Sequence, residues 1–281
     1  MAATCVVATA SCSSDGESSD QATSSSDAPT TEEAAGAYLA LGDSVPFGYR
    51  GGTPAEFSDA ANFVGYPELV AEELGLEVIN ASCPGETTAS LIDVTAQSNG
   101  CGNGSQSGSG YRATYPLHVR YDAVDQSQLD FAVDTLEETE VDLVTVQIGA
   151  NDVFICQRTT ADRCTSPATL QALGQTVQAG IDRILKTLRV HYDGQIVLVT
   201  YYALNYADAF GAATKTLGDG IAQIAEVNGA DLADGYEAFR ARAAETGGDS
   251  AAAGLVRPDD VHPSEEGQRL LADAVTAVVE D

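Results

Sequence analysis

The stretch VDLVTVQIGAND, residues 141–152, decides the fold class of this chain. Its first eight residues are dense in branched apolar side chains, and they form the strongest strand signal in the sequence. The polar residues GAND follow directly. In open sheets of parallel strands, ligands bind outside the carboxyl ends of the strands, so this position is suited to chemistry.

Strands and helices alternate on both sides of this stretch. Shorter apolar runs predict further strands over residues 38–41, 76–79 and 196–201. Apolar residues at helical spacing predict helices over residues 69–74, 129–136, 170–188, 221–227 and 265–279. Such alternation favours an α/β fold in which helices cover both faces of a parallel sheet.

Length and charge narrow the functional classes. The chain has 281 residues, enough for one α/β domain with a remainder at the N-terminus. Its 42 acidic and 13 basic residues give a formal net charge of -29, which is poorly suited to binding nucleic acid. A solubilising surface explains so much acid more simply than an attracted cation does. No apolar stretch reaches the 18 residues of a membrane-spanning helix.

The N-terminus differs in composition from the rest. Residues 1–12 are small and apolar, with Thr9-Ala10-Ser11 before Cys12, and they resemble the end of a bacterial lipoprotein signal. We expect lipidation of Cys12 as the only membrane attachment, the alternative being an apolar segment without function. Residues 13–35 are polar and acidic, which predicts a disordered tether. The folded domain is predicted over residues 36–281.

Four of the six cysteines lie in that domain, and they permit three disulfide pairings. We favour the two local pairs, Cys83–Cys101 and Cys156–Cys164, each of which closes a short loop. A zinc site would show closer cysteine pairs or neighbouring histidines, so no metal is expected. Disulfides imply an oxidising compartment, and we therefore expect an extracellular or cell-surface protein.

Three short motifs follow predicted strands. Gly42-Asp43-Ser44 could present a hydroxyl nucleophile, with helix-starting N–H groups beside it. Gly85 lacks a Cβ, so its N–H could approach a ligand closely. Asn151 offers a side-chain NH₂ that could stabilise an oxyanion. Taken alone, each has a simpler structural explanation, as a helix cap, a turn residue and a polar helix start.

A fourth motif lies near the C-terminus, in the stretch from Asp259 to Pro263. Asp259 precedes His262 by three residues, close enough for its carboxylate to hold the imidazole Nδ1–H and leave Nε2 free as a base. The adjacent Asp260 could substitute for it. The other two histidines, His118 and His191, lack such a neighbourhood.

In this order, the four motifs resemble the consensus blocks of the SGNH (GDSL-type) hydrolases: G-D-S, a loop glycine, G-x-N-D and D-x-x-H. The surrounding stretches SCPGETTASL and QIGANDVF, with Cys101, are similar to the secreted, disulfide-containing lipases and esterases of that superfamily. The resemblance implies a flavodoxin-like three-layer α/β/α sandwich. It also implies that Ser44 is the nucleophile and that His262 is the base, oriented by Asp259.

The resemblance further implies an oxyanion hole made by the backbone N–H groups of Ser44 and Gly85 and by the Asn151 side chain. The expected activity is hydrolysis of a small-molecule or lipid ester through an acyl-enzyme, without a cofactor. A carbohydrate acetylesterase on the same scaffold and a non-catalytic surface-binding domain remain as alternatives. We expect the loops over 47–66 and 99–119 to shape the acyl pocket, although their aromatic residues commonly pack in a core.

Overall fold

Five parallel strands form the central sheet of the computed structural model, which describes residues 35–104, 108–258 and 260–279. The strand order is β2-β1-β3-β4-β5. The strands are β1 (Ala37–Gly42), β2 (Glu77–Asn80), β3 (Val141–Gln147), β4 (Gln195–Val199) and β5 (Asp231–Ala233). Because all pairs are parallel, the carboxyl ends of the strands meet at one edge of the sheet.

Successive side chains of a strand point to opposite faces of the sheet, and each face carries its own core. In β1, Leu39 and Leu41 join one core, whereas Tyr38 and Ala40 join the other. All four side chains are fully buried. The central strands are therefore covered on both sides, which explains their dense apolar sequence.

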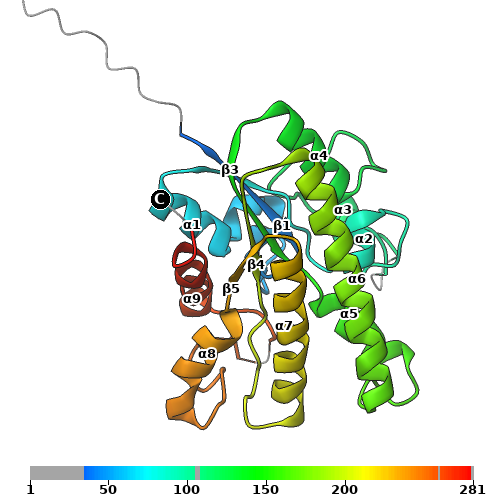
Figure 1. Cartoon of the computed structure of the whole chain (residues 1–281), viewed down its shortest axis with the longest axis vertical. Helices are drawn as coiled ribbons and strands as arrows, with labels where there is room; N and C mark the ends of the chain where they lie inside the picture. The colour runs from blue at the N-terminus through cyan, green and yellow to red at the C-terminus, as the bar shows by residue number, and fades with distance from the viewer. Residues whose placement is uncertain (1–34, 105–107, 259, 280–281) are drawn as a thin grey trace, which may run out of the picture. The chain divides into compact units, whose positions relative to one another are not determined.

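Helices cover both faces. On one side lie α1 (Tyr66–Leu74), α8 (Gly235–Ala243) and α9 (Glu265–Thr276). On the other lie α4 (Gln128–Glu138), α5 (Ala150–Thr159), α6 (Pro167–His191) and α7 (Ala209–Val227). Figure 1 shows the resulting three layers. The predicted flavodoxin-like α/β/α sandwich is confirmed.

A third, smaller core lies at the carboxyl edge of the sheet, where Phe47, Phe63 and Tyr111 pack around the disulfide between Cys83 and Cys101. Short elements surround it: the 3₁₀ turns Glu56–Ser58 and Ala60–Asn62, α2 (Thr88–Ile92) and α3 (Tyr111–Thr114). A second disulfide joins Cys156 to Cys164, between α5 and α6. Both predicted pairings are confirmed.

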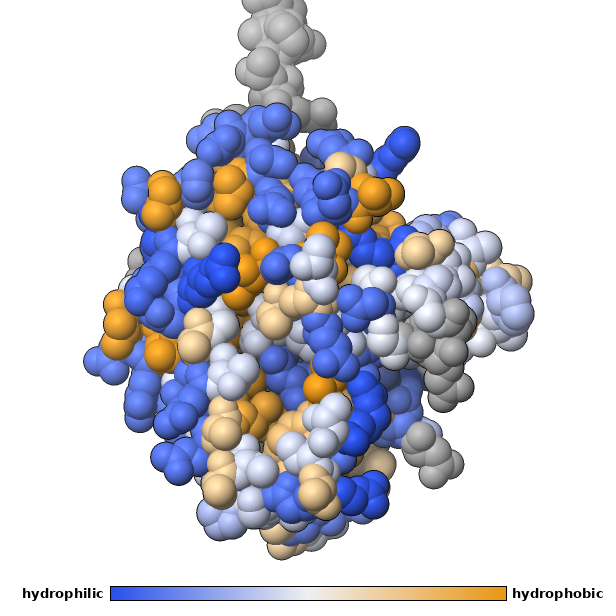
Figure 2. Space-filling view, turned by 90° about the vertical axis from the view of Figure 1, so that its right-hand side faces the viewer, coloured by the Kyte–Doolittle hydropathy of each residue, from blue (hydrophilic) through white to orange (hydrophobic). Residues whose placement is uncertain are grey.

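On the face seen in Figure 2, hydrophilic residues predominate and apolar residues form smaller patches between them. Within the described ranges, no helix has the length and apolar character needed to cross a bilayer. The predicted leader, tether and lipidation site, residues 1–12, 13–35 and Cys12, lie outside the described residues except for Ala35.

Candidate active site

Ser44 lies in a tight turn directly after β1. Gly42, at the end of the strand, has a φ of +148°, and a Cβ there would come within 2.1 Å of the Gln147 carbonyl oxygen. The chain then turns over residues 43–49, where the Tyr49 N–H donates to the Ser44 carbonyl oxygen at 2.9 Å. The predicted helix start at Ser44 is therefore wrong: the serine is presented by a single turn, and α1 begins only at Tyr66.

His262 contacts Ser44 although 218 residues separate them in sequence. Its Nε2 lies 2.9 Å from Ser44 Oγ, and its Nδ1 lies 2.7 Å from Asp260 Oδ1. Burial lowers the pKa of His262, and the Asp260 carboxylate opposes that shift. The lowered pKa favours the neutral imidazole, which is the form that can act as a base for the Ser44 hydroxyl.

The carboxylate that holds His262 in the structure is that of Asp260, two residues before the histidine. Asp259, which the motif predicts for this role, lies outside the described residues. The loop over 255–264, here called the histidine loop, is closed by backbone hydrogen bonds from Arg257 N–H to His262 O and from Ser264 N–H to Leu255 O. The Tyr202 hydroxyl donates to the Val261 carbonyl oxygen at 2.6 Å and ties this loop to the segment after β4.

Asp43 lies beneath the nucleophile and is fully buried. Its carboxylate accepts hydrogen bonds from the Val45 N–H at 3.0 Å, from Asn151 Nδ2 at 3.2 Å and from the Tyr201 hydroxyl at 2.5 Å. Burial raises the pKa of Asp43 to about 7, and these hydrogen bonds act against the rise. The sequence indicated Asp43 only as part of a motif, and nothing in it indicated Tyr201.

Gly85 lies in the loop after β2, over residues 80–103, which we call the oxyanion loop. Its φ is +87°, and a Cβ there would lie 2.8 Å from the backbone of Asn99, Gly100 and Cys101. Only glycine fits such a conformation and such close packing. The Gly85 carbonyl oxygen accepts the Asn99 N–H at 2.7 Å, which fixes the orientation of this peptide.

Asn151 is in the first turn of α5, directly after β3, and is nearly fully buried. Its Oδ1 accepts from Asn99 Nδ2 at 2.7 Å, so its Nδ2 is turned toward Asp43. Arg158 in turn donates to Asn99 Oδ1. Asn99 thus contacts both Gly85 and Asn151, the two oxyanion donors predicted beyond the Ser44 backbone. Sequence reasoning missed Asn99 because no spacing rule relates it to either residue.

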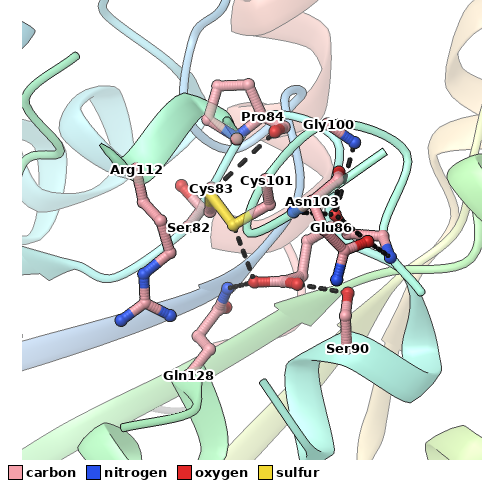
Figure 3. The surroundings of a disulfide bond; sticks show 12 residues. Ser82, Cys83, Pro84, Glu86, Ser90, Gly100, Cys101, Asn103, Arg112 and Gln128 are labelled. Atoms are coloured by element: carbon pink, nitrogen blue, oxygen red, sulfur yellow. Dashed lines mark hydrogen bonds between the residues drawn. A yellow bond between two sulfur atoms is a disulfide. The ribbon is translucent and has the colours of Figure 1, made fainter. Parts of the chain in front are cut away.

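Glu86, next to Gly85, is a buried acid that braces the oxyanion loop (Figure 3). It accepts from Ser90 Oγ and, at 3.2 Å, from Gln128 Nε2. Gln128 also hydrogen-bonds both the N–H and the carbonyl of Gly42, so it links the end of β1 to the oxyanion loop. Burial raises the pKa of Glu86 to about 7.

Glu86 lies 3.3 Å from Cys101 Sγ. Among the described residues, Cys83, Glu86 and Cys101 are the one group of metal-ligand side chains close together. Both sulfurs are bonded to each other, and a disulfide sulfur is not the thiolate that binds metals. This cluster therefore stabilises the loop and is not a metal site.

A cavity of about 360 Å³ opens at Ser44 and His262. Its apolar wall comes from α5, from α7 and from the segment after β4, and includes Phe154, Tyr201 and Phe210. None of the described residues of the loops over 47–66 and 99–119 lines it. Phe47, Phe63 and Tyr66 are fully buried in cores, whereas Tyr49 packs against His262 with 4.9 Å between the ring centroids. That these loops shape the acyl pocket stays a prediction.

Several solved structures share the fold of this chain. Solved structures with the same fold include an extracellular lipase from Streptomyces rimosus, with a TM-score of 0.58 and 19% identity over 87% of this chain and 100% of that chain. A phospholipase A1 from Streptomyces albidoflavus has a TM-score of 0.55 and 19% identity, over 88% of this chain and 100% of that chain. An acetylxylan esterase from Geobacillus stearothermophilus has a TM-score of 0.56 and 21% identity, over 87% of this chain and 95% of that chain.

At such identities these likenesses concern the fold alone, and no curated protein sequence matches the chain. A family model, however, matches residues 40–270, which include Ser44, Gly85, Asn151 and His262. With that match over most of its length, the chain belongs to the GDSL-like lipase/acylhydrolase family.

Proposed function

We propose that this protein is a serine esterase that hydrolyses carboxylic acyl esters in two steps. Ser44 Oγ attacks the ester carbonyl while His262 Nε2 takes its proton, and the alcohol leaves with that proton. Water then attacks the acyl-enzyme with His262 again as base, which releases the acid and restores Ser44. The observation that carries the proposal is the 2.9 Å contact between Ser44 Oγ and His262 Nε2, with a carboxylate on Nδ1.

The negative charge that develops on the carbonyl oxygen needs hydrogen-bond donors held in place beforehand. We assign this role to the backbone N–H groups of Ser44 and Gly85 and to Asn151 Nδ2. The proposal is supported by the contacts of Asn99 with both Gly85 and Asn151, which hold the two donors on one frame. Each such donor contributes about 2.7–4 kcal/mol of barrier lowering in serine hydrolases.

The carboxylate that orients His262 belongs to the pair Asp259 and Asp260. We assign the role first to Asp260, on the basis of its 2.7 Å contact with Nδ1. Asp259 remains the residue that the sequence motif predicts.

The location of the enzyme is also a proposal. Two disulfides support folding in an oxidising compartment, and we propose secretion on that basis. The structural likeness to an extracellular lipase agrees with this. A lipid anchor at Cys12, a tether over residues 13–35 and a catalytic domain over 36–281 complete the proposed arrangement.

The first experiment is hydrolysis of p-nitrophenyl acetate and butyrate by the wild type and by Ser44→Ala. We expect turnover by the wild type and a loss of about 10⁴–10⁶-fold in kcat in the variant. Labelling of the wild type by a fluorophosphonate probe, absent in Ser44→Ala, provides a readout that does not depend on the substrate. Equal turnover by both proteins, or no labelling of Ser44, would contradict the proposal.

A further inference from the structure

A second cavity adjoins the one at Ser44. It has a volume of about 500 Å³ and lies between α6 and the N-terminal half of α7. Five residues line both cavities and so join them: Val153, Gln157, Phe210, Thr214 and Leu217. The two cavities therefore adjoin along α5 and α7, and together they extend from Ser44 to α6; we call them the groove.

The walls of the second cavity are apolar or neutral. Leu170, Leu173 and Pro167 come from α6, and Ala213 and Leu217 from α7, with glutamine and threonine side chains between them. None of the described residues that line it is charged, although the chain carries 42 acidic and 13 basic residues. Without a cation, a phosphate or carboxylate group has no partner in the groove, whereas an alkyl chain needs none.

The spacing of the lining residues explains why a groove forms there. On α7, Phe210, Thr214 and Leu217 lie one above the other along one stripe, which spans about 10 Å of helix axis. Figure 1 shows α6 and α7 converging toward their C-terminal ends and diverging toward their N-terminal ends. The cavity lies between the N-terminal halves of the two helices, and this stripe lines it.

Two further features keep the groove open and accessible. Gly174, in the middle of its α6 wall, has no atom within 4 Å of the position of an added Cβ. Phe210 and Leu204 border the Ser44 cavity and are 54% and 47% exposed. Exposed apolar side chains beside an apolar groove are typical of a site that a ligand covers.

We propose that this groove binds the acyl chain of the substrate, and that the enzyme prefers long fatty acyl esters to acetyl esters. The inference rests on the proposed function of Ser44, since the chain must end at the attacked carbonyl. An acetyl group reaches only the first cavity and leaves the second unused. The groove thus favours the long acyl group of a lipid ester as the substrate, and not the acetyl group of an acetylated carbohydrate.

The test compares kcat/KM for p-nitrophenyl esters from acetyl to dodecanoyl. We expect about a fourfold increase per added methylene until the groove is filled, since each buried methylene strengthens transition-state binding. Gly174→Leu places a side chain in the groove, and the acetyl ester is the internal reference for each protein. The ratio of dodecanoyl to acetyl kcat/KM should fall about 10-fold or more in this variant.

The matched control is Ala179→Leu, which adds the same side chain to an exposed position of α6 that lines neither cavity. The chain-length ratio of this variant should equal that of the wild type. A ratio that does not rise with chain length in the wild type, or that is the same in Gly174→Leu and Ala179→Leu, would overturn the inference. Ser44-dependent acetyl hydrolysis in that case leaves the proposed function intact.

A binding measurement separates the two proposals if no ester is turned over. Calorimetric titration of 1-decanol into Ser44→Ala and into the double variant Ser44→Ala/Gly174→Leu does not require catalysis. Binding by the first protein that is weakened at least tenfold in the second supports the groove even if the proposed function fails. Absence of binding to Ser44→Ala would reject it.

Discussion

The oxyanion loop and the histidine loop both complete the site around Ser44, but they are held in different ways. The oxyanion loop is cross-linked by Cys83–Cys101 and braced by the buried side chains of Glu86 and Gln128. In its described part, the histidine loop has no disulfide; backbone hydrogen bonds, the Tyr202 hydroxyl, the Ser264 hydroxyl and the buried side chains of Leu255 and Val256 hold it.

This difference matches the two tasks. Oxyanion donors act because their positions are fixed before the reaction begins, so their loop gains from a rigid frame. In the proposed mechanism the histidine accepts and returns a proton, and it makes direct contacts with Ser44, with Asp260 and with the Tyr49 ring. Changes in the histidine loop should therefore lower kcat by removing single contacts of His262. Changes in the oxyanion loop should lower kcat by loosening the disulfide and the buried side chains that hold the loop in place.

The largest effect is expected in the histidine loop. Asp260→Asn keeps the shape of the side chain but removes the charge that stabilises the imidazolium, and it favours the wrong tautomer. We expect kcat to fall on the order of 10²–10⁴-fold. The measurement is kcat/KM against pH for short esters, with Asp259→Asn prepared in parallel.

A smaller loss in Asp259→Asn would assign the orienting role to Asp260. A larger loss in Asp259→Asn than in Asp260→Asn would assign the orienting role to Asp259, the residue that the motif predicts. The double variant decides whether the two carboxylates replace each other, since the two effects then combine to more than their sum.

A smaller effect is expected from the two disulfides. The Cys83–Cys101 and Cys156–Cys164 bonds separate their cysteines by 18 and 8 residues. Chain entropy alone predicts losses in unfolding free energy of about 3 and 2.5 kcal/mol on their removal, which is nearly the same. Removing the first by Cys83→Ser/Cys101→Ser should also lower kcat about 10-fold to 100-fold, because the oxyanion loop loses its frame.

The Cys156→Ser/Cys164→Ser variant is the matched comparison, and its kcat for short esters should fall less. Denaturant unfolding and kcat for p-nitrophenyl acetate, measured on both variants, separate stability from positioning. If both pairs lower kcat by the same factor, the cross-link of the oxyanion loop has no special role in catalysis.

The smallest effect on catalysis is expected at Glu86, where the readout is stability. Its pKa is raised to about 7 by burial, so the folded state holds this proton more tightly than the unfolded chain does. The resulting stabilisation is complete below the ordinary carboxyl pKa of about 4.3 and is lost as the pH rises to about 7. Glu86→Gln removes this dependence, so the free energy of unfolding should fall about 3 kcal/mol less between pH 4 and 8 than in the wild type.

Glu138→Gln, at an exposed position of α4, is the control and should follow the wild-type curve. Parallel curves for Glu86→Gln and the wild type would show that the buried acid does not titrate in this range. Asp43 shares a raised pKa with Glu86, so only the difference between the two curves is assigned to Glu86.

Strong local patterns made most of the fold predictable. The apolar run at 141–148 and the helical stripe over 170–188 correspond to β3 and to α6. In contrast, β5 contains only three residues, too few to show a period, and α8 is short with many polar residues. The sequence therefore did not indicate either of them.

In the site, the order of the motifs predicted which residues the fold brings together, because the first three follow strand ends at one edge of the sheet. What it did not predict is the network behind them. Asn99, Gln128 and Tyr201 act through contacts with residues 52 to 158 positions away, and no local pattern records such distances. For the same reason, the sequence of the loop over 47–66 did not distinguish pocket-lining aromatic residues from core residues such as Phe47 and Phe63.

The contact between Ser44 and His262 joins residues that are 218 positions apart, and this separation matters while the protein is being synthesised. Chains are synthesised from the N-terminus, so the serine and both oxyanion segments leave the ribosome long before the histidine. Any nascent chain that stops short of His262 carries a nucleophile without its base. On the proposed mechanism, the chain therefore cannot hydrolyse an ester until the histidine loop has been synthesised and has closed on Ser44.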